Sequence, residues 1–188
     1  MARQKSGVAE YRNYYLPYDF PVLLLSGEHW KISSVPSKNL HFHNCLEIGV
    51  CHSDSGYMEF IGKKDPLLFR EGDVTCIPRN IPHTTYSSPG TESHWSYLFI
   101  DPAELFHNIS PNFGRDFDLS LPAFKNYKHI LSRDEYPQVY QLTMAVIKEM
   151  EEKKPHYQTS VTGLLLALSI ELYRICLLYT SPSPRDTR

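Results

Sequence analysis

The stretch that decides the fold is His41–Val50, "HFHNCLEIGV", where two histidines lie two positions apart and a glutamate follows the second. On a β-strand, residues two apart share a face, so the spacing predicts that His41, His43, Cys45 and Glu47 point the same way. Two imidazoles and a carboxylate on one face can supply three ligands to a metal ion. A fourth ligand must then come from a neighbouring strand.

A second stretch, "EGDVTCIPRNIPH" (Glu71–His83), offers that ligand. His83 begins a strand directly after a tight corner, in which Pro78 and Pro82 fix φ and Asn80 stands where a positive φ would turn the chain. Together the two stretches predict a site for a divalent transition metal. Its ligands would be His41, His43, Glu47 and His83. The alternative is that the same side chains line a pocket that holds no metal.

The composition is that of a globular protein and gives no sign of nucleic-acid or membrane binding. The chain has 188 residues, of which 41% are hydrophobic and 21% charged, enough for one domain with a helical appendage. A net charge of −2, without a cluster of Lys and Arg, argues against DNA binding by this segment. The most apolar run, Gly163–Ile170, is far shorter than the roughly 20 residues that span a bilayer. Four cysteines in no disulfide pattern favour a cytoplasmic protein.

The character of the sequence changes near residue 100. From Pro21 to about Ile100, short β-type runs alternate with turns and predict an all-β barrel or sandwich. Asp101 then caps a short helix. A polar connector leads to a helix with its apolar residues at helical spacing between Val139 and Met150.

A second predicted helix, from about Gln158 to Ile175, is apolar over much more of its circumference. One face of such a helix is expected to pack on its own domain. The other face is expected to contact a partner, which predicts a homodimer through the C-terminal helices.

The two decisive stretches resemble the cupin motifs, HxHxxxE and G-x5-P-x-G-x2-H. The second motif fits without a gap through Gly72, Pro78, Asn80 and His83, with Asn as the best substitute for a glycine in left-handed conformation. In the first motif the leading glycine is missing and the following one comes late, at Gly56. The resemblance implies a mainly β cupin barrel (a double-stranded β-helix or jelly roll) followed by a pair of α-helices. It also maps His41, His43, Glu47 and His83 onto metal-binding positions.

The order of barrel and helices resembles the N-terminal sensor half of AraC-type transcription regulators, over about Tyr11 to Ile175. This resemblance implies a barrel that binds a small-molecule effector, often a sugar, a homodimer through the two helices, and DNA contacts only through a C-terminal helix-turn-helix half absent from this chain. The expected ligand-binding residues are His41, His43, Glu47, His83, Trp95 and Tyr97. The alternative for Trp95, Tyr97 and Phe99 is core packing.

Two other functions stay open. The first is a metal-dependent cupin enzyme of the sugar isomerase or dioxygenase type, which would use the four predicted ligands with an open coordination position. The second is a non-catalytic carbohydrate-binding dimer. No residue pattern indicates a hydrolytic nucleophile or a glycine-rich phosphate loop.

The end of the chain, "CLLYTSPSPRDTR" (Cys176–Arg188), breaks the second predicted helix abruptly. Cys176–Asp186 resembles the in-frame translation of a transposon-end sequencing adapter, and the alternative is a genuine Ser/Pro-rich tail. We expect residues 176–188 to be non-native and the native chain to continue beyond Ile175. The predicted organisation is an N-terminal arm (1–20), a cupin-like sensor barrel (21–107), a connector (108–132), a helical dimerisation segment (133–175) and this tail (176–188).

Overall fold

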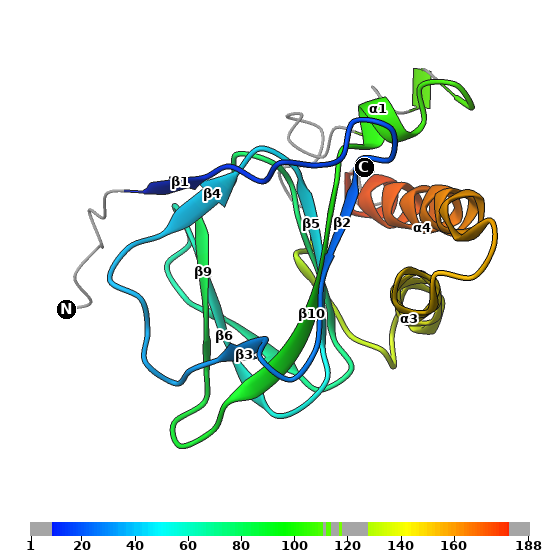
Figure 1. Cartoon of the computed structure of the whole chain (residues 1–188). Coiled ribbons are helices and arrows are strands. Elements are labelled where there is room, and N and C mark those ends of the chain that lie inside the picture. Colours follow the sequence, from blue (N-terminus) through cyan, green and yellow to red (C-terminus); the bar gives the residue numbers. More distant parts are fainter. Residues whose placement is uncertain (1–8, 111, 114–116, 118–127, 181–188) are drawn as a thin grey trace, which may run out of the picture.

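Two β-sheets face each other and enclose the interior of the domain (Figure 1). The computed structural model describes residues 9–110, 112–113, 117 and 128–180, the side chains of residues 177–180 excepted. Sheet A has the order β1 (Glu10–Arg12), β4 (His41–His43), β9 (His83–Ser87), β6 (Ser55–Phe60), β7 (Leu67–Arg70). Sheet B has the order β11 (Ile130–Leu131), β8 (Val74–Ile77), β5 (Leu46–Cys51), β10 (Ser93–Ile100), β2 (Val22–Leu25), and β3 (Lys31–Ile32) pairs with β10. The prediction of a mainly β fold is confirmed.

The decisive stretch is not one strand, and this part of the prediction is wrong. The chain leaves sheet A after His43 and enters sheet B at Leu46, so β4 and β5 belong to opposite sheets. The crossing residue Asn44 accepts a hydrogen bond from the backbone N–H of Tyr14 at 2.9 Å and donates one to the Tyr14 carbonyl at 3.0 Å. His41 and Glu47 therefore approach each other from facing sheets and do not share a strand face.

Sheet B is apolar on both faces, each of which covers a different core. Leu46, Ile48 and Val50 of β5 belong to the core shared with the C-terminal helices. Cys51 on the same strand packs in the barrel interior with Trp95. This alternation follows from the two-residue period of a strand and places Glu47 on the interior face.

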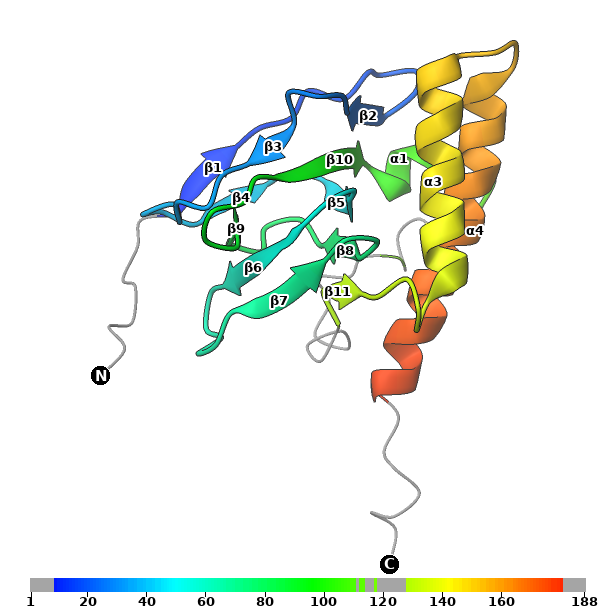
Figure 2. The same ribbon diagram turned by 90° about the horizontal axis from the view of Figure 1, so that it is seen from below.

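Helices α1, α3 and α4 belong to the described part of the chain after β10. α1 (Pro102–Leu105) begins as predicted, because the Asp101 carboxylate accepts hydrogen bonds from the N–H groups of Ala103 and Glu104 at 3.0 and 3.2 Å. α3 (Pro137–Glu152) and α4 (Tyr157–Thr180) lie side by side against the outer face of sheet B (Figures 1 and 2). Their buried residues complete the core outside the barrel.

The second long helix ends later than predicted. α3 ends at Glu152 and is capped by Lys153, which adopts a left-handed φ of 47°. α4 continues past Ile175 to Thr180 because the residues after Ile175 have no helix breaker until Pro182. By length and composition alone, Tyr157–Cys176 could cross a membrane, contrary to the estimate from the shorter apolar run. However, Val161, Leu165 and other buried residues of α4 pack inside the domain.

The segments outside the predicted barrel also contribute to the sheets. β1 belongs to the predicted N-terminal arm and pairs in parallel with β4, while residues 1–8 lie outside the described part. The connector contributes β11 and the buried Phe117, while residues 111, 114–116 and 118–127 lie outside the described part. Of the predicted non-native tail, residues 181–188 likewise lie outside it.

Two glycines provide a matched test of the packing. A Cβ on Gly56 of β6 would lie 2.2 Å from the Tyr86 carbonyl oxygen and 2.7 Å from Ser87 Cα. We expect Gly56→Ala to lower the free energy of unfolding by about 1–3 kcal/mol or more through overpacking. Gly163→Ala in α4, where nothing lies within 4 Å of the new methyl group, should raise it by about 0.5–1 kcal/mol. Urea denaturation of both variants measures this, and equal effects would contradict the packing described.

Candidate functional site

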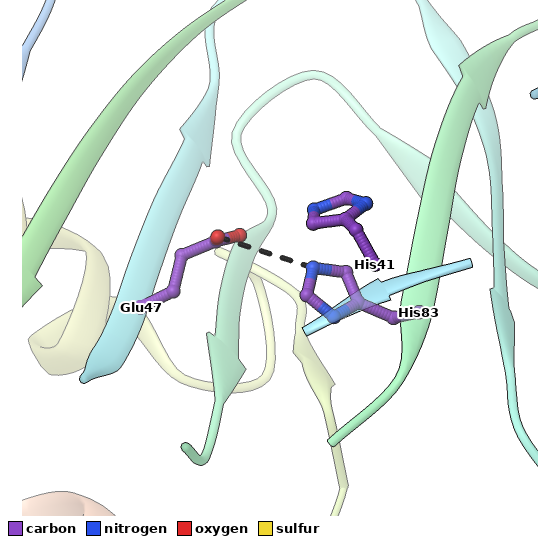
Figure 3. Close-up of side chains that lie close together, drawn as sticks. All are labelled: His41, Glu47 and His83. Carbon is purple, nitrogen blue, oxygen red and sulfur yellow. Dashed lines mark ion pairs between the residues drawn. The ribbon is translucent and has the colours of Figure 1, made fainter. Parts of the chain in front are cut away.

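Three of the four predicted metal ligands converge inside the barrel (Figure 3). His41 on β4 and His83 on β9 are directly paired across sheet A, and Glu47 reaches them from β5 in sheet B. One ligand atom from each of the three residues lies within 4.8 Å of those of the other two. This group is named the His41–Glu47–His83 triad below.

The fourth predicted ligand, His43, contacts Glu47 but lies outside the triad. Its Nε2 is 3.0 Å from Oε2 of Glu47, without the alignment of a hydrogen bond. The ring lies edge-on to Phe99, with centroids 5.6 Å apart. His43 therefore supports Glu47 directly, and a role as ligand would require its side chain to move.

Backbone carbonyls fix the tautomers of two histidines. The Nδ1 atoms of His43 and His83 lie 2.8 Å from the carbonyl oxygens of Cys45 and Ile81. A carbonyl oxygen only accepts, so each Nδ1 must carry the proton and donate it. In a neutral ring, Nε2 then carries a lone pair, and these atoms lie 3.0 and 3.9 Å from Glu47 Oε2. Lone pairs so close to a carboxylate need a positive charge between them, either a proton or a cation.

The electrostatics of the triad suit a cation. Burial raises the pKa of Glu47, but the contact with His43 and the charges of the surrounding imidazoles outweigh it and leave the pKa below its usual value. Burial, the charge of His83 and the charge of Arg12 together lower the pKa of His41 to about 3. Burial also lowers the pKa of His83, against the opposing effect of Glu47. Ionised carboxylate and neutral imidazole are the forms that bind a metal.

The residues present therefore fit a divalent transition metal. Two imidazoles and one carboxylate, with further positions open, form a donor set typical of zinc and non-haem iron sites. The Nδ1 bond of His83 is the kind of second contact that orients a ligating imidazole. His41, Glu47 and His83 would hold the ion.

A cavity of about 360 Å³ opens beside the triad. Of the predicted ligand-binding residues, His41, Glu47, His83 and Tyr97 line it. The remaining lining residues are Arg12, Tyr14, Leu25, Trp30, Lys31, Ile32, Ser33, Val35, Ser37, Thr84, Thr85 and Phe99. Its size is within the range of small-molecule sites.

The N-terminal segment forms part of this cavity, which sequence reasoning missed. Tyr14 stacks on Phe99 with ring centroids 3.8 Å apart, and Asn44 binds its backbone at two points. Arg12 follows from β1. No local pattern indicates that residue 14 meets residue 44, because a contact between distant segments leaves no periodic signal.

The aromatic residues of β10 divide between pocket and core. Tyr97 lines the cavity, and burial together with the charge of Glu47 raises the pKa of its hydroxyl well above the usual value. Trp95 does not line the cavity. Its indole is 1% exposed, donates a hydrogen bond to Ser93 Oγ at 2.8 Å, and packs edge-on against Phe69. The expected ligand-binding role of Trp95 has no support in this position, and core packing accounts for it.

A larger cavity, of about 620 Å³, lies elsewhere, between β7 and the segment that leads into α3. It contains none of the predicted site residues and no group of clustered metal ligands found in the described part of the chain. The smaller cavity is therefore the candidate site.

The solved structures that match the chain include cupin barrels, with partial overlap. A Cupin 2 conserved barrel domain protein from Salinispora arenicola is 16% identical over 48% of this chain and 84% of that chain, with a TM-score of 0.35. An RmlC-like cupin family protein from Methanocaldococcus jannaschii is 10% identical over 42% and 65% (TM-score 0.33). The oxalate decarboxylase of Bacillus subtilis is 18% identical over 37% and 19% (TM-score 0.31). Alignments this partial say nothing about what the chain binds.

The sequence itself has no such match. No protein-family model matches it, and a comparison with curated protein sequences gives no match.

The triad predicts how metal affinity depends on each side chain. We expect the chain to bind Co²⁺, seen by its visible absorption spectrum. Glu47→Gln and His83→Ala should each abolish this binding, because the first removes the negative charge of the carboxylate and the second removes a ligand atom. His43→Gln should weaken affinity by roughly 10–100-fold, as for a residue that supports a ligand. The exposed His107→Gln serves as control. Unchanged affinity in Glu47→Gln would contradict the assignment.

Half-buried histidines with lowered pKa values predict a loss of stability in acid. Burial, the charge of His83 and that of Arg12 lower the pKa of His41 to about 3, while burial and the charge of Lys63 lower that of His129 to about 4. The unfolded chain takes up protons at about 6.5, so metal-free stability should fall as the pH drops from about 6.5 towards 4. Urea midpoints between pH 7 and 4.5 measure this fall.

A matched pair of variants isolates the contribution of His129. The fall in stability should be smaller in His129→Gln than in the wild type, since this variant lacks one of the half-buried groups that resist protonation. The exposed His107→Gln should behave like the wild type. An unchanged slope in His129→Gln would count against the assigned burial.

Proposed function

We propose that this chain is the ligand-sensing and dimerisation part of an AraC-type transcription regulator, with a carbohydrate effector in the barrel. The observation that carries the proposal is the position of β5. Glu47 on its inner face lines the cavity, while Ile48 and Val50 on its outer face pack in the core shared with α3 and α4. A ligand that contacts Glu47 thus lies one residue away from the contacts that position the helices.

The mechanism follows from this shared strand. A ligand shifts a conformational equilibrium only if it binds one state more tightly than the other. A sugar hydroxyl bound to Glu47 would favour one position of β5. Since cores are close-packed, the change would reach α3 through Ile48 and Val50.

Dimerisation would use the part of α4 that the domain leaves open. Leu164, Leu166 and Ile170 are only half-buried, although the helix also carries a fully buried face. A second copy covering these residues would remove apolar surface from water. DNA contacts would come from a helix-turn-helix half encoded beyond this chain, as the resemblance implies.

A second candidate function is a metal-dependent cupin enzyme. The observation that favours it is the triad itself, whose donor set leaves coordination positions open beside a cavity. A metal bound there would supply Lewis acidity. Glu47 and the two histidines would hold it, and Tyr97 and Trp30 would position a ring against the cavity wall.

Binding without turnover distinguishes the two functions. We expect saturable binding of at least one member of a panel of monosaccharides, uronic acids and sugar phosphates in titration calorimetry, with the compound recovered unchanged. Binding should slow hydrogen exchange in α3. Glu47→Gln should weaken the binding affinity by tenfold or more, as the loss of a charge-assisted hydrogen bond does. The exposed Glu104→Gln on α1 is the control. Metal-dependent conversion of the compound would establish the enzyme and refute the sensor.

A further inference from the structure

We propose that the effector carries an anionic group, a carboxylate or a phosphate, which Arg12 binds at the mouth of the cavity. The inference rests on the proposed function, because it names the chemical class of the effector. Arg12 on β1 would then be the residue that selects an anionic effector.

The parallel register of β1 and β4 directs Arg12 into the site. Arg12 is paired with His43 and Tyr11 with Phe42. Residues in register on parallel strands point to the same face of a sheet, and the 5.3 Å approach of the Tyr11 and Phe42 rings shows this for the outer pair. Arg12 therefore extends from the face that carries the histidines, and it lines the cavity.

Arg12 is held at this position by its neighbours. Tyr14, two residues further on, is fixed by the two Asn44 hydrogen bonds and by its stacking on Phe99. The Arg12 side chain lines the cavity together with Tyr14, His41 and His83.

The cavity has a negatively charged side chain at its buried end and positively charged side chains at its open end. Glu47, at the buried end, is in contact with His43 and His83. Arg12 and Lys31, both exposed, stand at the open end. The carboxylate of Glu10, itself largely exposed, lies 3.7 Å from Nε of Arg12. It approaches Nε, and the planar guanidinium is the group that forms paired hydrogen bonds with carboxylates and phosphates.

The lining between these ends fits a hydroxylated ring. Trp30 and Tyr97 are aromatic residues of this lining, and Thr84 and Thr85 are polar residues of it. A sugar acid or a sugar phosphate could direct its hydroxyls to Glu47 and its anion to Arg12. A neutral sugar would leave the guanidinium without a partner in the ligand.

Matched pairs of neutral and anionic sugars test the inference on the full chain. The probes are D-glucose with D-glucuronate and D-glucose 6-phosphate, and D-galactose with the corresponding anions, in titration calorimetry. We expect at least one anion to bind about tenfold more tightly than its neutral parent, the gain of a charge-assisted pair. The gain should shrink as salt is added. A gain confined to uronates or to phosphates identifies which anion the site takes.

Two Arg12 variants and a control test whether Arg12 causes the preference for the anion. Arg12→Gln should bring the anion to the affinity of its neutral parent, and Arg12→Lys should retain part of the preference because it keeps the charge but loses the planar fork. Lys148→Gln, on the exposed side of α3, removes one positive charge elsewhere and should retain the preference. Circular dichroism confirms that each variant is folded.

The contrary outcomes differ for the two proposals. Equal affinity for an anion and its neutral parent, or a preference that survives in Arg12→Gln, overturns the inference and leaves a carbohydrate sensor in place. Binding of no probe refutes the carbohydrate sensor, and the inference is refuted with it.

Discussion

The architecture depends on the need to stabilise one buried carboxylate. Glu47 is 4% exposed in an interior that is otherwise aromatic and aliphatic. An isolated ionised carboxylate in such surroundings is strongly unfavourable, on the order of tens of kcal/mol by solvation alone in a fully apolar medium. A proton or a cation between Glu47 and Nε2 of His43 and His83, which belong to the opposite sheet, offsets this cost. The distance between the sheets at this end of the barrel is therefore constrained by the pairing.

The same constraint explains why the rings of His43 and His83 are each held by a hydrogen bond at Nδ1, on the side away from Glu47. An imidazole that is free to rotate could turn Nε2 away from Glu47 and leave the carboxylate unpaired. The carbonyls of Cys45 and Ile81 prevent this by holding Nδ1. Both carbonyls belong to turns at the ends of strands, where backbone groups are not used by the sheet. Tight corners on either side of the barrel thus serve the site as well as the chain reversal.

Local signals allowed much of this fold to be predicted, and long-range contacts account for what they missed. The turn at Asn80 was predictable from residue type, and its φ of 62° confirms the prediction. The break between β4 and β5 was not predictable, because the alternation of side chains continues across it. The break is caused by the contact of Asn44 with Tyr14, which lies 30 residues away in the sequence. β1, β3 and β11 are too short, at two or three residues, for a period to be visible. At the site, spacing identified the right residues, but only the positions of the ligand atoms in the folded chain separate the triad from His43.

The guanidinium at the mouth also bears on the metal. Arg12 is close enough to His41 and His83 to lower their pKa, so it must also oppose a divalent cation held by the same side chains. An anion bound by Arg12 would cancel this repulsion. Metal and anionic ligand would then each raise the affinity of the site for the other, by equal factors, since coupling between two ligands is reciprocal. Without such an anion, the charge of Arg12 would weaken metal binding. The metal affinity of the site would then be lower than the three ligands alone suggest.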